Sequence, residues 1–283
     1  PTRRSSDLAA FNSAHVANAT NVTVSNMTIA SIAGNSSSAL SDYNLQASTL
    51  VWGSGGAANT SATITAANVS VIATGNITKV YDGSTNATIA SGNYNVTGAV
   101  AGDVFTLGNL SNAAFNSAHV ANATNVTVSN MTIASIAGNS SSALSDYNLQ
   151  ASTLIWGSGG AANTSATITA ANITITGTTV ANKVYDGTAT ATLSNGTISG
   201  AITGDTFTLT QAGNFSSANA GNNLSITANN SFVIASSNSS SALSDYNLVQ
   251  PTGLQANITK RSITLSDTQI GRASCRERVS SPV

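Results

Sequence analysis

The sequence has little of what catalytic and redox-active proteins commonly use. Among 283 residues there are one cysteine, two histidines and three prolines, and 7% of the residues are charged. A single cysteine excludes an internal disulfide framework and a site built from several thiolates. No apolar run approaches the roughly 20 residues of a membrane-spanning helix. Low charge together with 41% hydrophobic residues also argues against a solvated, disordered chain.

The two ends of the chain differ from the rest. The first eight residues, and the segment that follows Gln269, can be encoded by opposite strands of one short oligonucleotide. This pairing resembles a translated sequencing adapter on a metagenomic fragment, so 1–8 and 269–283 are excluded from the fold argument. The exclusion removes five of nine basic residues and the only cysteine. Four cations then remain against eight aspartates, a net charge of −4, which excludes a basic nucleic-acid site.

The remaining chain is repetitive. Residues 9–68 recur as 113–172 with a single change, from Val51 to Ile155. The motif Lys-Val-Tyr-Asp-Gly at 79–83 also recurs 104 residues later. A third, diverged copy retains the Ser-Asp-Tyr-Asn-Leu motif and lacks the Trp-Gly-Ser-Gly-Gly segment of the other two. A period near 100 residues indicates discrete domains in tandem, because solenoid repeats have periods of roughly 20–50 residues.

These repeats predict a simple domain organisation. We expect the C-terminal part of one unit with its linker at 9–78, a complete unit at 79–182, and a shorter unit with the start of a linker at 183–268. Stretches such as 125–133 and 165–175 alternate β-branched and polar residues, and Gly-containing turns separate them. No helical period is present. The predicted fold is therefore all-β, with tandem immunoglobulin-like antiparallel β-sandwich units in series.

Candidate chemistry is sparse. His15 and His119 have no Cys, Glu or second His close in the sequence, so we predict neither a metal site nor a catalytic triad there. The chain is accordingly predicted not to be an enzyme and to carry no cofactor. Calcium is the one alternative, since Asp82 and Asp186 recur once per unit. An Asp before Gly is, however, more commonly a turn former.

Two further features leave alternatives open. Trp52 and Trp156 precede a glycine-rich hairpin tip, where a ring either packs into the core or is exposed for contact with a ligand. In addition, 22 of the 33 asparagines lie in Asn-x-Ser/Thr triplets. Alternation along strands accounts for many of these triplets, because positions i and i+2 share the solvated face. Glycosylation of these asparagines is the second explanation.

The repeated motif also carries a family resemblance. Segments 79–89 and 183–193 resemble the YDG repeat domain of large bacterial adhesins of the filamentous-haemagglutinin-like, two-partner-secretion type. The repeat-signature residues are Lys79, Tyr81, Asp82, Gly83, Lys183, Tyr185, Asp186 and Gly187.

The resemblance implies a location and partners. It implies a secreted or cell-surface region of a Gram-negative adhesin, with an outer-membrane transporter as its partner during secretion. A glycan or protein of the host-cell surface is the implied ligand. The predicted function is a non-catalytic stalk that acts as a spacer and contributes to cell adhesion. The alternative is a glycan- or protein-binding module that uses the Trp-Gly-Ser-Gly-Gly hairpin.

Overall fold

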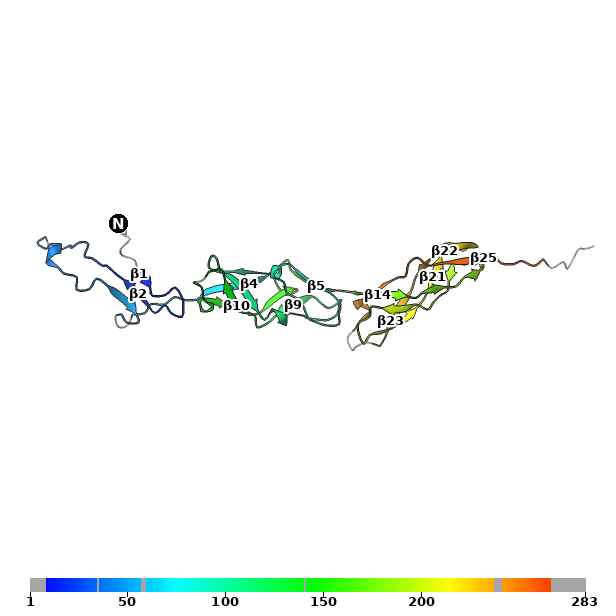
Figure 1. The fold of residues 1–283 in the computed structure, drawn as a ribbon, viewed down its shortest axis with the longest axis horizontal. Coiled ribbons are helices and arrows are strands. Elements are labelled where there is room, and N and C mark those ends of the chain that lie inside the picture. Colours follow the sequence, from blue (N-terminus) through cyan, green and yellow to red (C-terminus); the bar gives the residue numbers. More distant parts are fainter. Residues whose placement is uncertain (1–8, 35, 57–59, 140, 237–240, 266–283) are drawn as a thin grey trace, which may run out of the picture. The chain divides into compact units, whose positions relative to one another are not determined.

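The chain is built almost entirely from short strands and turns (Figure 1). The computed structural model describes residues 9–34, 36–56, 60–139, 141–236 and 241–265. Within these ranges the only helices are three-residue 3-10 turns, which confirms the all-β prediction. None of these helices is long and apolar enough to cross a membrane. The chain divides into two compact units, Pro1–Ala171 with Ser240–Asp245, and Asn172–Ser239 with Tyr246–Val283.

Alternation of side chains explains why these segments form strands. In β14 (Ala171–Thr176), Ala171, Ile173 and Ile175 are buried, and the polar residues between them are exposed. β13 (Ser165–Thr169) follows the same rule. A period of two places one row of side chains in the core and the other in solvent, which β-branched residues favour.

The second repeat forms a β-sandwich within the first unit. Its small sheets have the strand orders β11-β4-β6, β10-β7, β12-β9-β8 and β13-β5. The strands are β4 (Ala67–Ala73), β5 (Asn76–Val80), β6 (Tyr94–Thr97), β7 (Val104–Gly108), β8 (Ala114–Phe115), β9 (Asn125–Val128), β10 (Thr132–Ala137), β11 (Tyr147–Leu149), β12 (Leu154–Gly157) and β13. Val69, Phe105 and Tyr147 form one part of its core.

The third repeat forms a second sandwich, with a five-stranded sheet in the order β16-β25-β22-β21-β17. The other sheets are β19-β14-β24, β20-β23 and β15-β18. The strands are β15 (Thr179–Val180), β16 (Lys183–Val184), β17 (Thr190–Ala191), β18 (Leu193–Ser194), β19 (Thr197–Ser199), β20 (Thr206–Thr210), β21 (Gly213–Phe215), β22 (Gly221–Ala228), β23 (Ser231–Ser236), β24 (Tyr246–Val249) and β25 (Gln255–Thr259). Leu193, Phe215, Ile226 and Ile258 are among its buried core residues.

The absence of the glycine-rich hairpin changes the strand order of the third repeat. In the second repeat, β9 pairs with β12, which leads into the hairpin. The third repeat has no counterpart of β12, and β22 pairs directly with the last strand, β25. In the shorter repeat, β25 therefore lies beside β22, in the place that β12 takes beside β9 in the second repeat.

Both complete repeats also contain parallel pairs, which the expectation of purely antiparallel units did not include. β13 lies parallel to β5, and β25 lies parallel to β16. β11 also lies parallel to β4. In each case a late strand of the repeat lies beside an early one, and the intervening strands supply the long connection that parallel pairing needs.

The strand pairing also locates the start of a repeat. β4 pairs with β6 and β11, and β14 lies between β19 and β24. These two strands therefore belong to the repeats that follow them. Each lies several residues before the Lys-Val-Tyr-Asp-Gly motif, whereas the sequence prediction began its repeats at Lys79 and Lys183.

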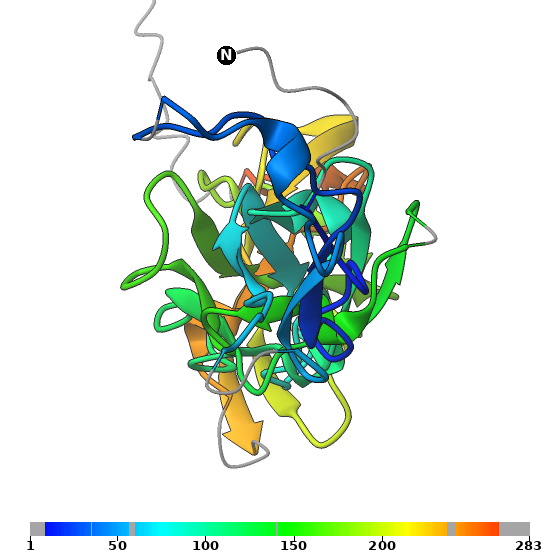
Figure 2. The ribbon, with the colours of Figure 1, turned by 90° about the vertical axis from the view of Figure 1, so that its left-hand side faces the viewer.

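The first copy is much less complete. It contains β1 (Ala9–Phe11), β2 (Asn21–Val24) and β3 (Leu50–Gly53), paired in that order. These strands belong to the segment drawn in blue in Figures 1 and 2. The described chain starts at Ala9, so it holds no counterpart of β4 to β7 for this copy.

Candidate functional site

The Lys-Val-Tyr-Asp-Gly motif forms a turn closed by its own polar groups. The Lys79 Nζ donates to Asp82 Oδ1 at 2.6 Å and to the Ser84 carbonyl at 2.6 Å. The Ser84 backbone N–H donates to the same carboxylate oxygen at 2.9 Å. Gly83 has a φ of +77°, a left-handed conformation that favours glycine. The Lys79 ammonium also lies 5.8 Å from the centre of the Phe115 ring.

The third repeat reproduces this turn. Lys183 Nζ donates to Asp186 Oδ1 at 2.9 Å and to the Thr188 carbonyl at 2.7 Å. Hydrogen bonds to the carboxylate lower the pKa of Asp186 to about 2, with the largest contribution from the Thr188 backbone N–H and the next from Lys183. For Asp82, burial acts to raise the pKa, but the hydrogen bonds from Lys79 and Ser84 outweigh it and lower the pKa. The charged form of both carboxylates is thus engaged inside the turn.

The signature tyrosines differ between the two repeats. Tyr81 is 4% exposed, and its hydroxyl lies 2.8 Å from Ser241 Oγ, within the first unit. Tyr185 is the corresponding residue of the second unit and is 40% exposed. The backbone of both is held in the same way, since each N–H donates to the carbonyl of a threonine on the last strand, Thr169 or Thr259.

The structure decides between the two alternatives for the hairpin tryptophan of the second repeat in favour of a packed ring. Trp156 is 0% exposed, and its Nε1 donates to the carbonyls of Asn93, at 2.7 Å, and Thr74, at 3.2 Å. A buried indole that donates its N–H to the backbone is a core residue. Trp156 therefore has no surface with which to stack on a ligand.

The glycine after Trp156 is required by the hairpin itself. Gly157 has a φ of +80°, and a Cβ there would lie 2.3 Å from the Thr124 carbonyl oxygen. Trp52 occupies the same sequence position in the first copy and is 36% exposed. Its ring borders an open groove of about 520 Å³ with Phe11 and Val22. Trp52 thus remains partly accessible because fewer strands cover it.

Both histidines bind an aspartate from the repeat that follows in the sequence. His15 Nδ1 lies 2.7 Å from Asp146 Oδ2, and the Val16 N–H donates to Asp146 Oδ1 at 2.8 Å. His119 Nδ1 lies 2.8 Å from Asp245 Oδ2, and the Val120 N–H donates to Asp245 Oδ1 at 2.8 Å.

The burial of the aspartates indicates that these histidine contacts have a structural role. The side chain of Asp245 is fully buried, and that of Asp146 is 16% exposed. Burial acts to raise the pKa of Asp146, while hydrogen bonds from His15 and from backbone N–H groups outweigh it and lower the pKa. Sequence reasoning missed this pairing because the partners lie more than a hundred residues apart, although both motifs recur.

A second pairing that the sequence analysis missed joins a tyrosine to an aspartate in each complete repeat. The Tyr147 hydroxyl donates to Asp103 Oδ2, and the Tyr246 hydroxyl donates to Asp205 Oδ2. Burial, and then the hydrogen bond to Asp103, raise the pKa of Tyr147. The signal was present in the sequence, since the Gly-Asp-x-Phe-Thr-Leu and Ser-Asp-Tyr-Asn-Leu motifs occur together in both complete repeats.

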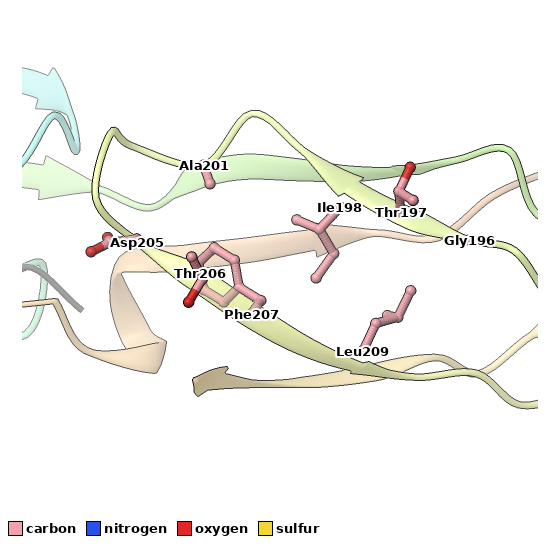
Figure 3. Close-up of a pocket in the computed structure, with 8 residues that line it drawn as sticks. All are labelled: Gly196, Thr197, Ile198, Ala201, Asp205, Thr206, Phe207 and Leu209. Carbon is pink, nitrogen blue, oxygen red and sulfur yellow. The ribbon is translucent and has the colours of Figure 1, made fainter. Parts of the chain in front are cut away.

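The second unit has a concavity of about 460 Å³ beside the pair formed by Tyr246 and Asp205. Figure 3 shows the side chains of Ile198, Phe207 and Leu209 lining it. The corresponding position in the second repeat holds Tyr94 where this repeat has Gly196, so a smaller residue opens the space. The carboxylate at its edge, Asp205, is bonded to Tyr246. The concavity thus has both apolar walls and polar ones, the latter from Thr197, Asp205 and Thr206.

The described residues hold few side chains that could bind a metal ion or act in catalysis. Across the described residues, no three His, Cys, Asp or Glu side chains gather as metal ligands would. These residues therefore form no cluster of carboxylates for the calcium site considered from the sequence. Ser13 and Ser117 accept hydrogen bonds from the backbone N–H groups of His15 and His119, and the imidazole rings bind the aspartates instead.

Comparison with known proteins gives a family. The YDG domain family matches the chain twice, over residues 65–154 and 169–253. Both matches begin near β4 and β14, in agreement with the strand pairing described above. No curated protein and no solved structure shows significant similarity to the chain.

Proposed function

The chain belongs to the YDG domain family, and we propose that it is a non-catalytic repeat region of a large bacterial adhesin, secreted or exposed on the cell surface, where it acts as a spacer. The observation that supports this proposal is that the family-signature residues bind one another within a turn. Lys79 and Asp82 bind each other and Ser84, and Lys183 and Asp186 form the same closed turn. What recurs from repeat to repeat is therefore a structural turn.

The alternative, a ligand-binding module centred on the hairpin, has less support. In a complete repeat the tryptophan of the hairpin is Trp156, and its buried indole donates to the backbone carbonyls of residues 74 and 93. The third repeat also forms its sandwich without the hairpin. A module whose ligand site is absent from one repeat and buried in another fits a scaffold better than a receptor.

Nucleic-acid binding is a further alternative that charge argues against. Among the described residues the cations are Lys79, Lys183, Lys260 and Arg261. Two of these four are already paired with aspartates. Affinity for DNA or RNA comes largely from several Lys and Arg side chains that neutralise phosphates. The described part of the chain offers no such row of cations, so a gel-shift assay of residues 9–265 at low salt is expected to show no retardation.

The spacer proposal can be tested on a cell surface. One, two and three copies of the chain are inserted between a membrane anchor and a small epitope tag on encapsulated cells. Antibody access to the tag should rise with copy number, and a Gly/Ser linker of equal length should give less access, because the span of a random coil grows only as the square root of its length. Equal access for array and linker would contradict the proposal.

A parallel assay tests the binding alternative. The purified chain is applied to host cells together with a Ser158→Arg variant, which alters an exposed residue of the hairpin tip. A spacer predicts little binding of either protein. Saturable binding that the substitution abolishes would favour the binding module, because the change leaves the buried Trp156 in place.

A further inference from the structure

An early strand and the last strand of the second repeat lie parallel to each other. β5 and β13 pair from Asn76 with Ser165 to Val80 with Thr169. The chain enters this pair at the start of β5 and leaves it at the end of β13. In a parallel pair these two points lie at opposite ends. Tension along the chain therefore pulls the two strands lengthwise past each other, and the hydrogen bonds between them share the load.

The direction of pulling sets the barrier to rupture. If the two strands were antiparallel, the chain would enter and leave at the same end, and tension would open the pair one hydrogen bond at a time. A pair that is pulled lengthwise must lose its hydrogen bonds nearly together, so its barrier is higher. Forced unfolding follows the rate of crossing this barrier and not the equilibrium stability.

The Lys-Val-Tyr-Asp-Gly motif continues the pair beyond its last ladder residues. The Tyr81 N–H donates to the Thr169 carbonyl at 2.8 Å, and the Thr169 hydroxyl donates to the Lys79 carbonyl at 3.3 Å. The side chains of Ile77, Tyr81 and Ile168 are buried. β5 therefore cannot slide along β13 unless apolar side chains leave the core, which costs free energy in proportion to the area exposed.

The strand before β5 resists the same tension. β4 lies parallel to β11, and the Gln150 N–H donates to the Val69 carbonyl at 2.9 Å just beyond their last residue pair. On its other side β4 pairs with β6. A pull on the chain before β4 acts on both of these pairs before it reaches β5.

The third repeat has the same arrangement with a shorter parallel pair. In β16 and β25, Lys183–Val184 pairs with Ile258–Thr259, which is two residue pairs against five in the second repeat. Just before this pair, the Asn257 N–H donates to the side-chain oxygen of Asn182 at 2.7 Å. A side chain thus takes the place of a ladder hydrogen bond, and fewer backbone bonds share the load.

We propose that the parallel pair in each of these two repeats is a mechanical clamp, which lets the repeat carry tension along the chain without unfolding. The Lys-Val-Tyr-Asp-Gly motif secures the end of the clamp, which gives its recurrence a physical reason. The clamp of the second repeat is the stronger one, because more residue pairs share the load. This inference goes beyond the spacer role and concerns each repeat by itself, so it does not depend on whether the array serves an adhesin.

Single-molecule pulling tests the clamp. The full chain is held by handles at its two ends, and the lifetime of each repeat is measured at one constant force. Ile77→Val and Ile258→Val each remove one buried methyl group from the clamp of one repeat. Each should shorten the lifetime of its own repeat about fivefold, because the lost contact belongs to the rupture step, and this change identifies the two unfolding events. In the wild type the second repeat should outlast the third.

A substitution outside the clamp is the matched control. Val128 lies on β9 and is fully buried, so Val128→Ala should lower the stability of the second repeat in urea. Its lifetime under force should change by less than about twofold, because the contacts of β9 persist when the clamp breaks. An unchanged lifetime for Ile77→Val together with a shorter one for Val128→Ala would overturn the proposal.

A change in the direction of pulling gives a sharper test. In a chain with Thr85→Cys and Cys275→Ser, one handle is attached at exposed position 85, shortly after β5, and the other at the C-terminal end of the chain. Both handles then pull on the same end of the β5–β13 pair, while the third repeat is loaded as before.

At the same force, the lifetime of the second repeat should fall more than about tenfold, since fewer hydrogen bonds break in each step. The lifetime of the third repeat should stay the same and serves as the reference within each molecule. Equal lifetimes of the second repeat in the two pulling directions would overturn the clamp, whatever the spacer assay shows.

Discussion

The first and second copies hold nearly the same 60 residues and fold to different extents. Tyr43 is 54% exposed and its counterpart Tyr147 is 9% exposed, while Trp52 and Trp156 differ in the same sense. The residues do not account for the difference, because Val51 and Ile155 are the one substitution between the copies. Burial in this family of repeats is decided by the strands that come before these 60 residues in the chain.

A six-residue segment shows how this works. Thr132–Ala137 forms β10 because it pairs with β7, with Ile136 opposite Phe105. The identical residues 28–33 form no strand. Their alternation is the same, but no counterpart of β7 is described for them. An alternating sequence can thus form a strand, but it does so only when a neighbouring strand supplies hydrogen bonds and covers its apolar face.

The largest expected difference between the copies is at the tryptophan. Trp156→Ala should destabilise the second repeat by about 3–5 kcal/mol, because it empties a closed site. Trp52→Ala should cost less than about 1 kcal/mol, because the ring is already partly in solvent. Urea unfolding followed by far-UV circular dichroism measures both free energies. Equal losses for the two variants would contradict the burial described here.

A smaller effect is expected at the tyrosine of the Ser-Asp-Tyr-Asn-Leu motif. Tyr147→Phe removes the hydroxyl that donates to Asp103 and leaves a half-buried carboxylate with one partner fewer. We expect a loss of about 1–3 kcal/mol in the free energy of unfolding. Tyr43→Phe serves as the matched control and should change it by less than about 0.5 kcal/mol. A measurable cost at Tyr43 would show that the first copy is covered in solution.

The sequence predicted the parts of this structure that depend on short-range pattern. Alternation gave the strands, the Asp-Gly pairs gave the turns, and the internal repeats gave tandem sandwiches. The sequence left the burial of Trp156 open between two alternatives and did not predict the parallel pair of β5 and β13, because burial and pairing depend on residues about 60 to 90 positions away. The His–Asp contacts were missed for the same reason. A recurring residue shows that a role recurs, and only the folded chain shows its partner.

The next effect concerns the Ala-Leu-Ser-Asp segment, which occurs at 39–42 in the first copy and at 143–146 in the second. Asp146→Asn removes a charge that His15 and the Val16 N–H bind, and should cost about 1 kcal/mol. Asp42→Asn should cost about half as much, because that carboxylate binds mainly within its own loop. Hydrogen exchange at the Val16 amide should accelerate in Asp146→Asn and stay unchanged in Asp42→Asn. Acceleration in neither variant would contradict the contact.

The pH dependence of the same contact has a defined sign. The pKa of Asp146 is lowered in the folded chain from its ordinary value of 3.8. Its contribution to stability is therefore fully present above pH 3.8 and is lost as the pH falls below that value, through the folded pKa. Exchange at Val16 should accelerate over this range in the wild type, and Asp146→Asn should remove the acceleration.

The smallest effect is expected at the Lys-Asp turn, which should not depend on neighbouring strands at all. Its hydrogen bonds join groups within six residues in both repeats, so the pKa of Asp82 and that of Asp186 should both lie below the ordinary value although the repeats differ in strand order. The pKa of Asp186 is lowered to about 2. The stabilisation from its charge is complete above pH 3.8 and disappears as the pH falls through about 2. Carboxyl carbon NMR shifts follow both residues directly, and a normal pKa for either would show that its turn is open in solution.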